Sequence, residues 1–173
     1  VSLLKKIAEK PEPDKGQFQG EYDVNKQREW SKFLLEYIGF DMDAGVMSES
    51  AHPFTTGFGP KDVRVTNHYR KAQPIDAMFS MIHEGGHGIF EQGVDAFYAG
   101  TDVEKIGFLG LHESQSRFYE NILGRNINFW KPIYEKLGEC MPKFKDISLE
   151  DFYKEINHVV PSCIRTMADE VTY

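Results

Sequence analysis

The chain has 173 residues, a formal net charge of −7 and a sequence pI near 5.4. This length allows one hydrophobic core, so we expect residues 1–173 to form a single region, and the acidic balance gives no electrostatic reason to expect a nucleic acid or an anionic membrane as partner. No stretch approaches the roughly eighteen consecutive apolar residues of a membrane-spanning helix, and the first residues do not form a basic and then apolar export signal.

Helical periodicity dominates the chain, because apolar residues recur at spacings of three and four through most segments. The first amphipathic segment covers residues 1–10, and a loop with two prolines and two glycines covers 11–20. A second helix is predicted over about 22–39, with Gly39 as its stop. Residues 41–61 are rich in Gly, Ser, Asp and Pro, which predicts a long irregular connection.

The clearest strand pattern lies at residues 62–69. Val63 and Val65 alternate there with polar residues, which predicts a single strand or hairpin arm. Pro74 suits the first turn of a helix that runs to about Gln92, just before a glycine. The predicted fold class is therefore mainly α, with a small β element that precedes this helix.

Helices are also predicted in the last third of the chain. One helix, or a bent pair, should cover residues 103–123, and another should cover 127–140. The last helix begins at Ser148, which can form a capping box with Asp151, and continues toward the end of the chain with a kink or split at Pro161. Because the chain opens on a helical pattern without Met and stops inside another, we expect an excerpt of a longer, mostly helical protein.

The strongest chemical signal is the sequence HEGGH that begins at His83. On a helix His83 and His87 lie one turn apart on the same face, so both imidazoles can bind one zinc ion. Glu84 lies roughly 100° around the helix, where it can act as general base toward a water at an open position of the metal. Gly85 and Gly86 together cost about 2 kcal/mol of helix propensity relative to alanine, which is easier to understand if a backbone or substrate approaches closely there.

A catalytic zinc needs a third protein ligand and an open position. Glu113 in the sequence LHESQ lies 26 residues after His87, which is enough for the first helix to end and an antiparallel helix to return. His112 is an alternative ligand, although a carboxylate is the commoner partner of two histidines. The ordinary structural alternatives are a surface glutamate and two histidines satisfied by carbonyl groups or water.

These residues resemble the carboxypeptidase Taq family of metallocarboxypeptidases, because five motifs occur in the family's order. The motifs are HPF at 52–54, DVRVT at 62–66, HEGGH at 83–87, HESQ at 112–115 and IRTMAD at 164–169. In that family His83, His87 and Glu113 would correspond to the metal ligands and Glu84 to the catalytic base. The resemblance implies a zincin-like helical metallopeptidase core with a small sheet beside a groove. It also implies zinc or sometimes cobalt, a homodimer, and peptide substrates with a free C-terminus.

Three further residues are candidates for substrate binding. Arg165 lies in the IRTMAD motif, and its guanidinium is well shaped to bind a terminal carboxylate, although an intrahelical pair with Asp169 explains it equally well. Arg64 and His52 can also face the groove, while ordinary strand and loop roles explain them as well. The family's later motif GxxQDxHW and its long N-terminal helical region do not occur in these 173 residues, so the resemblance implies a fragment.

Two alternatives to a carboxypeptidase stay open at this point: an oligopeptidase of the related helical HEXXH class, and a non-catalytic helical scaffold with structural histidines. The cysteines also indicate a cellular compartment. Cys140 and Cys163 are the two cysteines of the chain and lie in helix-like segments, which favours reduced thiols over a secreted disulfide framework. We therefore expect a cytoplasmic protein without a membrane partner.

Overall fold

The structure is a computed structural model that describes residues 2–10, 16–98, 100–103 and 109–159. Within these ranges it is mainly helical with one three-stranded sheet, so the predicted fold class is confirmed. The α-helices are α1 (Ser2–Ala8), α2 (Val24–Ile38), α3 (Pro74–Gln92), α4 (Leu109–Arg117), α5 (Ile127–Trp130), α6 (Tyr134–Cys140) and α7 (Leu149–Ile156). A π-helix covers Phe118–Leu123, and short 3₁₀ segments cover Gly16–Phe18, Ala96–Tyr98 and Pro142–Asp146. The strands are β1 (Gly45–Glu49), β2 (Thr55–Gly57) and β3 (Val63–Asn67).

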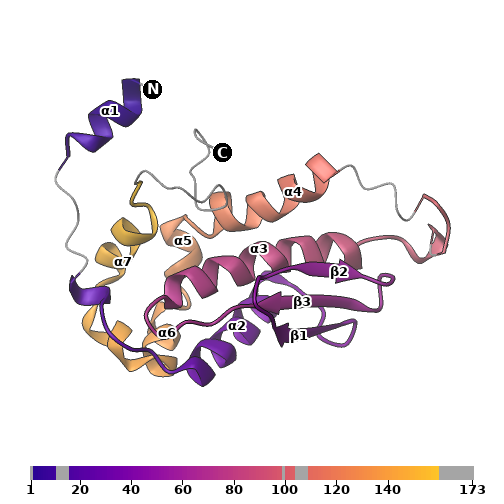
Figure 1. The fold of residues 1–173 in the computed structure, drawn as a ribbon, viewed down its shortest axis with the longest axis horizontal. Coiled ribbons are helices and arrows are strands. Elements are labelled where there is room, and N and C mark those ends of the chain that lie inside the picture. The colour runs from indigo at the N-terminus through magenta and orange to yellow at the C-terminus, as the bar shows by residue number, and fades with distance from the viewer. Residues whose placement is uncertain (1, 11–15, 99, 104–108, 160–173) are drawn as a thin grey trace.

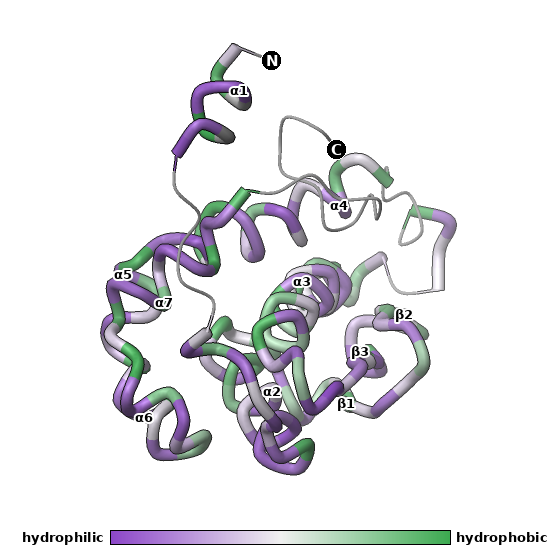
Figure 2. The backbone as a smooth tube through the Cα atoms, turned by 60° about the vertical axis from the view of Figure 1, so that its left-hand side comes forward, coloured by the Kyte–Doolittle hydropathy of each residue, from purple (hydrophilic) through white to green (hydrophobic). Residues whose placement is uncertain are grey.

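Helix α3 is the central element of the fold. It runs between the sheet on one side and α4 on the other, with α2 packed along it (Figure 1). The view in Figure 2 shows the same arrangement, with α3 surrounded by α2, the sheet and α4. The predicted helix from Pro74 to Gln92 is confirmed, with Pro74 in its first turn. Met81 and Ile82 are completely buried on different sides of the helix, which is the pattern of a helix covered all round.

The sheet has the strand order β1-β3-β2, so β3 is its centre. β1 pairs with β3 in parallel, and β2 pairs with it antiparallel with Thr55 opposite Val65. Val63 and Val65 are fully buried in a cluster with Met81 of α3. Because side chains alternate along a strand, Arg64 points to the other face, and it is exposed there. The predicted single strand at 62–69 is confirmed as β3.

Strands β1 and β2 lie inside residues 41–61, where we predicted an irregular connection, so that prediction was wrong. β1 has no fully buried residue, since Gly45 and Met47 are half-buried and its other three residues are exposed, and β2 has only three residues. The sequence of neither strand therefore shows an alternation of apolar and polar residues. The hydrogen bonds that make them strands come from β3, which is a contact between distant parts of the chain.

Helix α2 begins and ends as the sequence predicts. The Asp23 side chain accepts hydrogen bonds from the backbone N–H groups of Asn25 and Lys26, which satisfies the first free donors of the helix. Gly39 ends it in the left-handed conformation, with a φ of 101°. Trp30 and Leu34 lie in the main apolar core, which joins α2 and α3 to α5, α6 and α7.

The helices of the last third are shorter than predicted. The segment predicted at 127–140 is split into α5 and α6, because Pro132 lacks an N–H and its ring clashes with the preceding turn. In the segment predicted at 103–123, α4 passes directly into the π-helix, while residues 104–108 lie outside the described ranges. No helix in the described part of the chain is both long and apolar enough to cross a bilayer.

The last helix, α7, starts after Ser148, whose side chain accepts a hydrogen bond from the backbone of Asp151 as the capping box predicts. It ends at Ile156 instead of continuing. Arg125 donates to the Ile156 carbonyl, and the Asn157 amide donates to the Tyr153 carbonyl, so groups outside the helix satisfy its last acceptors. The predicted kink at Pro161, like Cys163, falls outside the described residues.

Candidate metal centre

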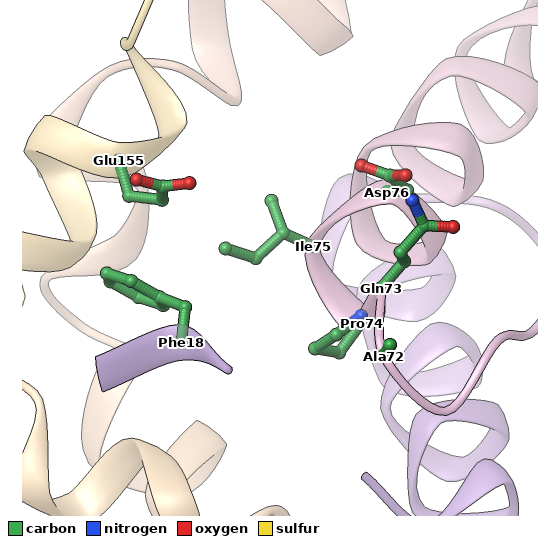
Figure 3. A pocket seen from close by; sticks show the side chains of 7 residues that line it. All are labelled: Phe18, Ala72, Gln73, Pro74, Ile75, Asp76 and Glu155. Carbon is green, nitrogen blue, oxygen red and sulfur yellow. The ribbon is translucent and has the colours of Figure 1, made fainter. Parts of the chain in front are cut away.

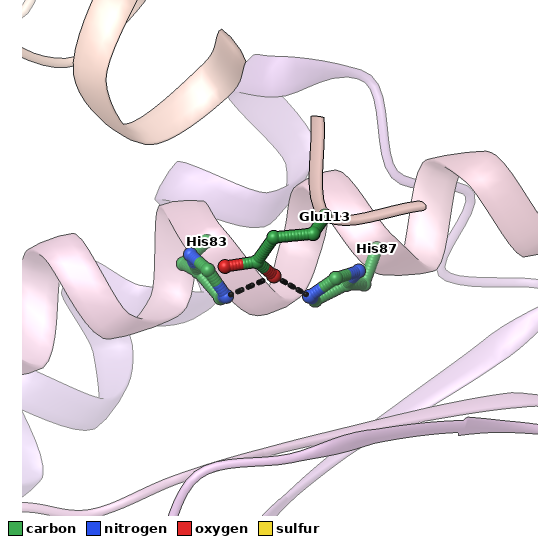
Figure 4. Close-up of side chains that lie close together, drawn as sticks. All are labelled: His83, His87 and Glu113. Carbon is green, nitrogen blue, oxygen red and sulfur yellow. Dashed lines mark ion pairs between the residues drawn. The ribbon is translucent and has the colours of Figure 1, made fainter. Parts of the chain in front are cut away.

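Three side chains from two helices converge on one point. His83 and His87 project from the same side of α3, and the carboxylate of Glu113 on α4 lies between the two rings (Figure 4). Oε2 of Glu113 is 3.6 Å from Nε2 of His83 and 3.2 Å from Nε2 of His87. One ligand atom from each residue lies within 4.8 Å of the other two.

The donor set and two of its three separations fit a zinc ion. Ligands in a tetrahedral zinc site lie at about 2.0–2.1 Å from the metal, so neighbouring ligand atoms are about 3.3 Å apart. The two separations from the Glu113 oxygen, 3.6 and 3.2 Å, are close to that value. Two imidazole nitrogens and one carboxylate oxygen are also a typical catalytic zinc set, which leaves one position open.

The two glycines of the HEGGH sequence allow other helices to approach α3. A Cβ added at Gly86 would lie 2.8 Å from the Cα of Ser116, so α4 crosses α3 with its backbone almost in contact. A Cβ at Gly85 would lie 2.6 Å from the side chain of Ile38, which belongs to α2. The expectation that a backbone approaches closely is therefore confirmed for Gly86. The close approach of α4 at Gly86 also brings Glu113 near the histidines.

Glu84 lies on the sheet side of α3 and is held by β2. The Thr55 hydroxyl donates to Oε2 of Glu84 at 2.7 Å, and the Glu84 side chain is nearly buried, with 8% of the residue exposed. Burial raises the pKa of the Glu84 carboxyl, and the hydrogen bond from Thr55 partly offsets this. The charges of His83 and His52 also lower this pKa, and the negative charge of Glu113 raises it.

His83 has a carboxylate behind it that the sequence analysis missed. Nδ1 of His83 lies 2.7 Å from Oε2 of Glu120, on the π-helix. Arg117 joins the two acidic residues, since its guanidinium contacts Glu113 at 3.2 Å and Glu120 at 3.3 Å. Glu120 follows Glu113 by seven residues, which is two helical turns, so a search for polar residues on the face of Glu113 would have found it.

On its Nδ1 side, His87 contacts a second histidine instead of a carboxylate. Nδ1 of His87 lies in hydrogen-bond contact with Nδ1 of His112, and Nε2 of His112 lies 2.7 Å from Oε1 of Glu91. Both ring nitrogens of His112 are thus engaged. Of the two candidates for the third ligand, the structure brings Glu113 to the two Nε2 atoms and places His112 behind His87.

The pKa values of the two imidazoles move in opposite directions. Burial lowers the pKa of His83, but the hydrogen bond and charge of Glu120 outweigh it, so the net pKa is raised above 6.5. Burial also lowers the pKa of His87, the neighbouring charges of His83 and His112 lower it further, and it falls to about 4. The surroundings therefore favour the protonated form of the His83 imidazole and the neutral form of the His87 imidazole.

The residues predicted to bind substrate are dispersed. His52 is exposed and close enough to Glu84 for its charge to lower the pKa of that carboxyl. Arg64 points away from α3, forms a two-point ion pair with Asp62 and lies over the ring of Phe58, so the structure does not bring it to the metal cluster. Arg165 lies outside the described residues.

A separate pocket of about 170 Å³ lies at the N-terminal end of α3. Figure 3 shows the side chains of Asp76 and Glu155 on opposite sides of Ile75. Burial raises the pKa of the Asp76 carboxyl. None of the candidate ligands lines this pocket, so it does not belong to the metal cluster.

Comparison with known proteins identifies a family that the chain matches. The sequence profile described as "Carboxypeptidase Taq (M32) metallopeptidase" matches residues 1–173. The chain is 44% identical over 175 residues to "Carboxypeptidase 1" of Bacillus subtilis, covering 100% of the chain and 35% of that relative. It is 41% identical over 161 residues to "Thermostable carboxypeptidase 1" of Thermus thermophilus, covering 93% of the chain and 32% of that relative.

The structural match is equally extensive. The M32 carboxypeptidase from Deinococcus radiodurans superposes with a TM-score of 0.93 at 34% sequence identity, and the match covers 100% of this chain and 35% of that chain. The chain thus spans about a third of the length of the relatives it matches.

Proposed function

Because this chain belongs to the carboxypeptidase Taq (M32) metallopeptidase family, we propose that it is the metal-binding core of a zinc-dependent metallocarboxypeptidase. In this proposal His83 and His87 bind the metal through Nε2, Glu113 binds it through its carboxylate, and Glu84 is the general base. The observation that carries the proposal is the convergence of the three donor atoms within 4.8 Å, with Glu84 beside them on the same helix as the histidines.

The residues around the metal have distinct tasks. Zinc, when bound, supplies a Lewis acid that polarises the scissile carbonyl group and makes a water more acidic. Glu84 accepts the proton of the attacking water and passes it to the leaving amine. Its burial supports this role, because a carboxylate with a raised pKa can both accept a proton and return it. Since Thr55 engages Oε2, we assign the proton transfer to Oε1.

The substrates proposed for the whole protein are peptides with a free C-terminus, which are shortened by hydrolysis of their last bond. Support comes from the relatives, which are named carboxypeptidases and of which the chain covers about 35%. Cobalt is a second metal compatible with the same ligands. A homodimeric assembly and a cytoplasmic location belong to the proposal too, and they rest on the family resemblance and on the cysteine usage, with Cys140 a free thiol.

The test combines metal analysis with two substitutions and one control variant. We expect about one zinc per chain after purification in zinc-replete medium, and its loss in His83→Ala. Glu84→Gln should retain the zinc but lower hydrolysis of a peptide with a free C-terminus by about 10²–10⁴-fold. Glu36→Gln is a matched control, because Glu36 forms an exposed ion pair with Lys32 on α2 and should leave both quantities unchanged.

Three results would contradict the proposal. A wild-type protein that binds no zinc would exclude the metal site. A Glu84→Gln protein with a rate within a few-fold of wild type would exclude Glu84 as the base. Equal cleavage of free and amidated peptides at internal bonds would indicate an endopeptidase instead of a carboxypeptidase.

A further inference from the structure

We propose that His112 and Glu91 form a positioning relay for His87, and that Glu120 is the corresponding positioning residue for His83. Each chain of hydrogen bonds turns one imidazole so that its Nε2 faces the metal. The inference rests on the proposed function, since it concerns the same metal. It assigns roles to three residues that lie behind the two ligand histidines.

The direction of the relay follows from metal binding at Nε2 of His87. An imidazole that binds a metal through Nε2 carries its remaining proton on Nδ1. That proton is donated to Nδ1 of His112, which must then be unprotonated, so the proton of His112 sits on Nε2. The Nε2–H group of His112 in turn donates to Oε1 of Glu91, at 2.7 Å. All three groups therefore have one consistent arrangement of protons.

The surroundings of the relay hold it in this orientation. The ring of His112 packs on the ring of Phe90, with centroids 4.6 Å apart. On the other side, a Cβ added at Gly57 of β2 would lie 2.7 Å from Oε2 of Glu91, so the glycine leaves room for the carboxylate in this position. The relay thus joins α4, the end of α3 and the edge strand β2.

The other ligand histidine, His83, contacts its carboxylate directly. Nδ1 of His83 lies 2.7 Å from Glu120 without an intermediate residue, and Glu120 is nearly buried, with 8% exposed. Arg117 contacts both Glu120 and Glu113, so it ties the positioning carboxylate to the third ligand. Each imidazole is therefore linked to a carboxylate by hydrogen bonds, His83 directly and His87 through His112. Groups of this kind fix the tautomer and orientation of a ligand, and their loss lowers metal affinity about 10- to 100-fold.

The experiment measures zinc affinity of the whole protein by competition with a chromophoric chelator. His112→Phe retains a ring for Phe90 to pack on but removes the acceptor for His87. His112→Asn restores an acceptor, because its side-chain oxygen occupies nearly the position of Nδ1. His68→Phe is the matched control, since His68 contacts the backbone of Ser50 away from the cluster.

We expect zinc affinity to fall at least about 10-fold in His112→Phe and to return to within about 3-fold of wild type in His112→Asn. His68→Phe should bind zinc as wild type does. In ¹⁵N spectra of the zinc-loaded wild type, His87 should carry its proton on Nδ1 and His112 on Nε2. A loss of affinity that His112→Asn does not reverse would show a structural role only and overturn the proposal.

Two further results would also overturn it. One is a His112→Phe protein with zinc affinity within about 2-fold of wild type. The other applies if His112→Phe does not fold: Glu91→Ala then tests the relay from its far end, and unchanged affinity there contradicts it. A wild type that binds no zinc would instead refute the proposed function, so the two failures are distinguishable.

Discussion

Replacing Gly86 by alanine is expected to weaken zinc binding while the chain still folds. Gly86 lies on α3 between the two ligand histidines, on the side where α4 crosses. A Cβ added there would lie 2.8 Å from the Cα of Ser116 and 3.3 Å from the carbonyl oxygen of Gln115. Both are backbone atoms, which cannot turn aside as the end of a flexible side chain can.

The size of the displacement follows from these distances. Ordinary contacts of a Cβ begin at 3.4 Å, so the backbone of α4 at Ser116 must move by about 0.6 Å from its present 2.8 Å to reach one. Glu113 is three residues earlier in the same helix and moves with it. Metal–ligand distances tolerate about 0.2 Å, so this shift is about three times too large. We expect zinc affinity to fall at least about 10-fold.

The fold itself should be retained. Alanine gains about 1 kcal/mol of helix propensity over glycine, and overpacking costs about 1–3 kcal/mol, so the free energy of unfolding should fall by no more than about 2 kcal/mol. Gly85→Ala is the matched control. Its Cβ would meet the side-chain ends of Ile38 and Leu35, at 2.6 and 2.8 Å, on the α2 side of the helix. It changes propensity and packing similarly without reaching Glu113.

The assay measures zinc affinity by chelator competition and stability by urea unfolding of the zinc-free protein, for both variants. Gly86→Ala should lose affinity while Gly85→Ala keeps it. If Gly86→Ala binds zinc within 2-fold of wild type, the close approach of α3 and α4 does not place Glu113. If both variants lose affinity equally, general destabilisation explains the loss and the geometric reasoning is wrong.

Three further predictions concern the base, the ligands and a helix cap. Thr55→Val removes the hydrogen bond that lowers the pKa of Glu84, so the acid limb of kcat/KM should move to higher pH, while Thr55→Ser should leave it in place; an unmoved limb in Thr55→Val contradicts this. As the pH is lowered from 6.5 to about 4, zinc affinity should fall by about one log unit per pH unit. His83, with its raised pKa, must lose a proton to bind zinc, whereas His87, with its lowered pKa, is already neutral in this range. A slope of two across that range in titration calorimetry would be inconsistent with these pKa directions. Asp23→Ala should lower the free energy of unfolding by about 1 kcal/mol in urea, whereas Asp23→Asn should retain most of it, and equal stability of the two variants would show that the cap contributes nothing.

Local patterns in the sequence determined the elements that carry the candidate metal centre. Pro74 and the apolar spacing after it predicted α3, and the spacing of His83 and His87 placed both imidazoles on one face of it. The five motifs predicted the family, which the profile match over the whole chain confirms. These features are readable because helix periodicity and motif order depend on neighbouring residues alone.

Other features were decided by contacts between distant segments. β1 and β2 are strands because β3 supplies their hydrogen-bond partners, and no alternation of apolar and polar residues within 41–61 predicts them. The bond from Thr55 to Glu84 spans 29 residues, and the position of His112 behind His87 spans 25. Such contacts depend on how closely helices and strands approach each other. That distance is set by side-chain volume at the crossing, which the packed structure shows and the order of residues alone does not.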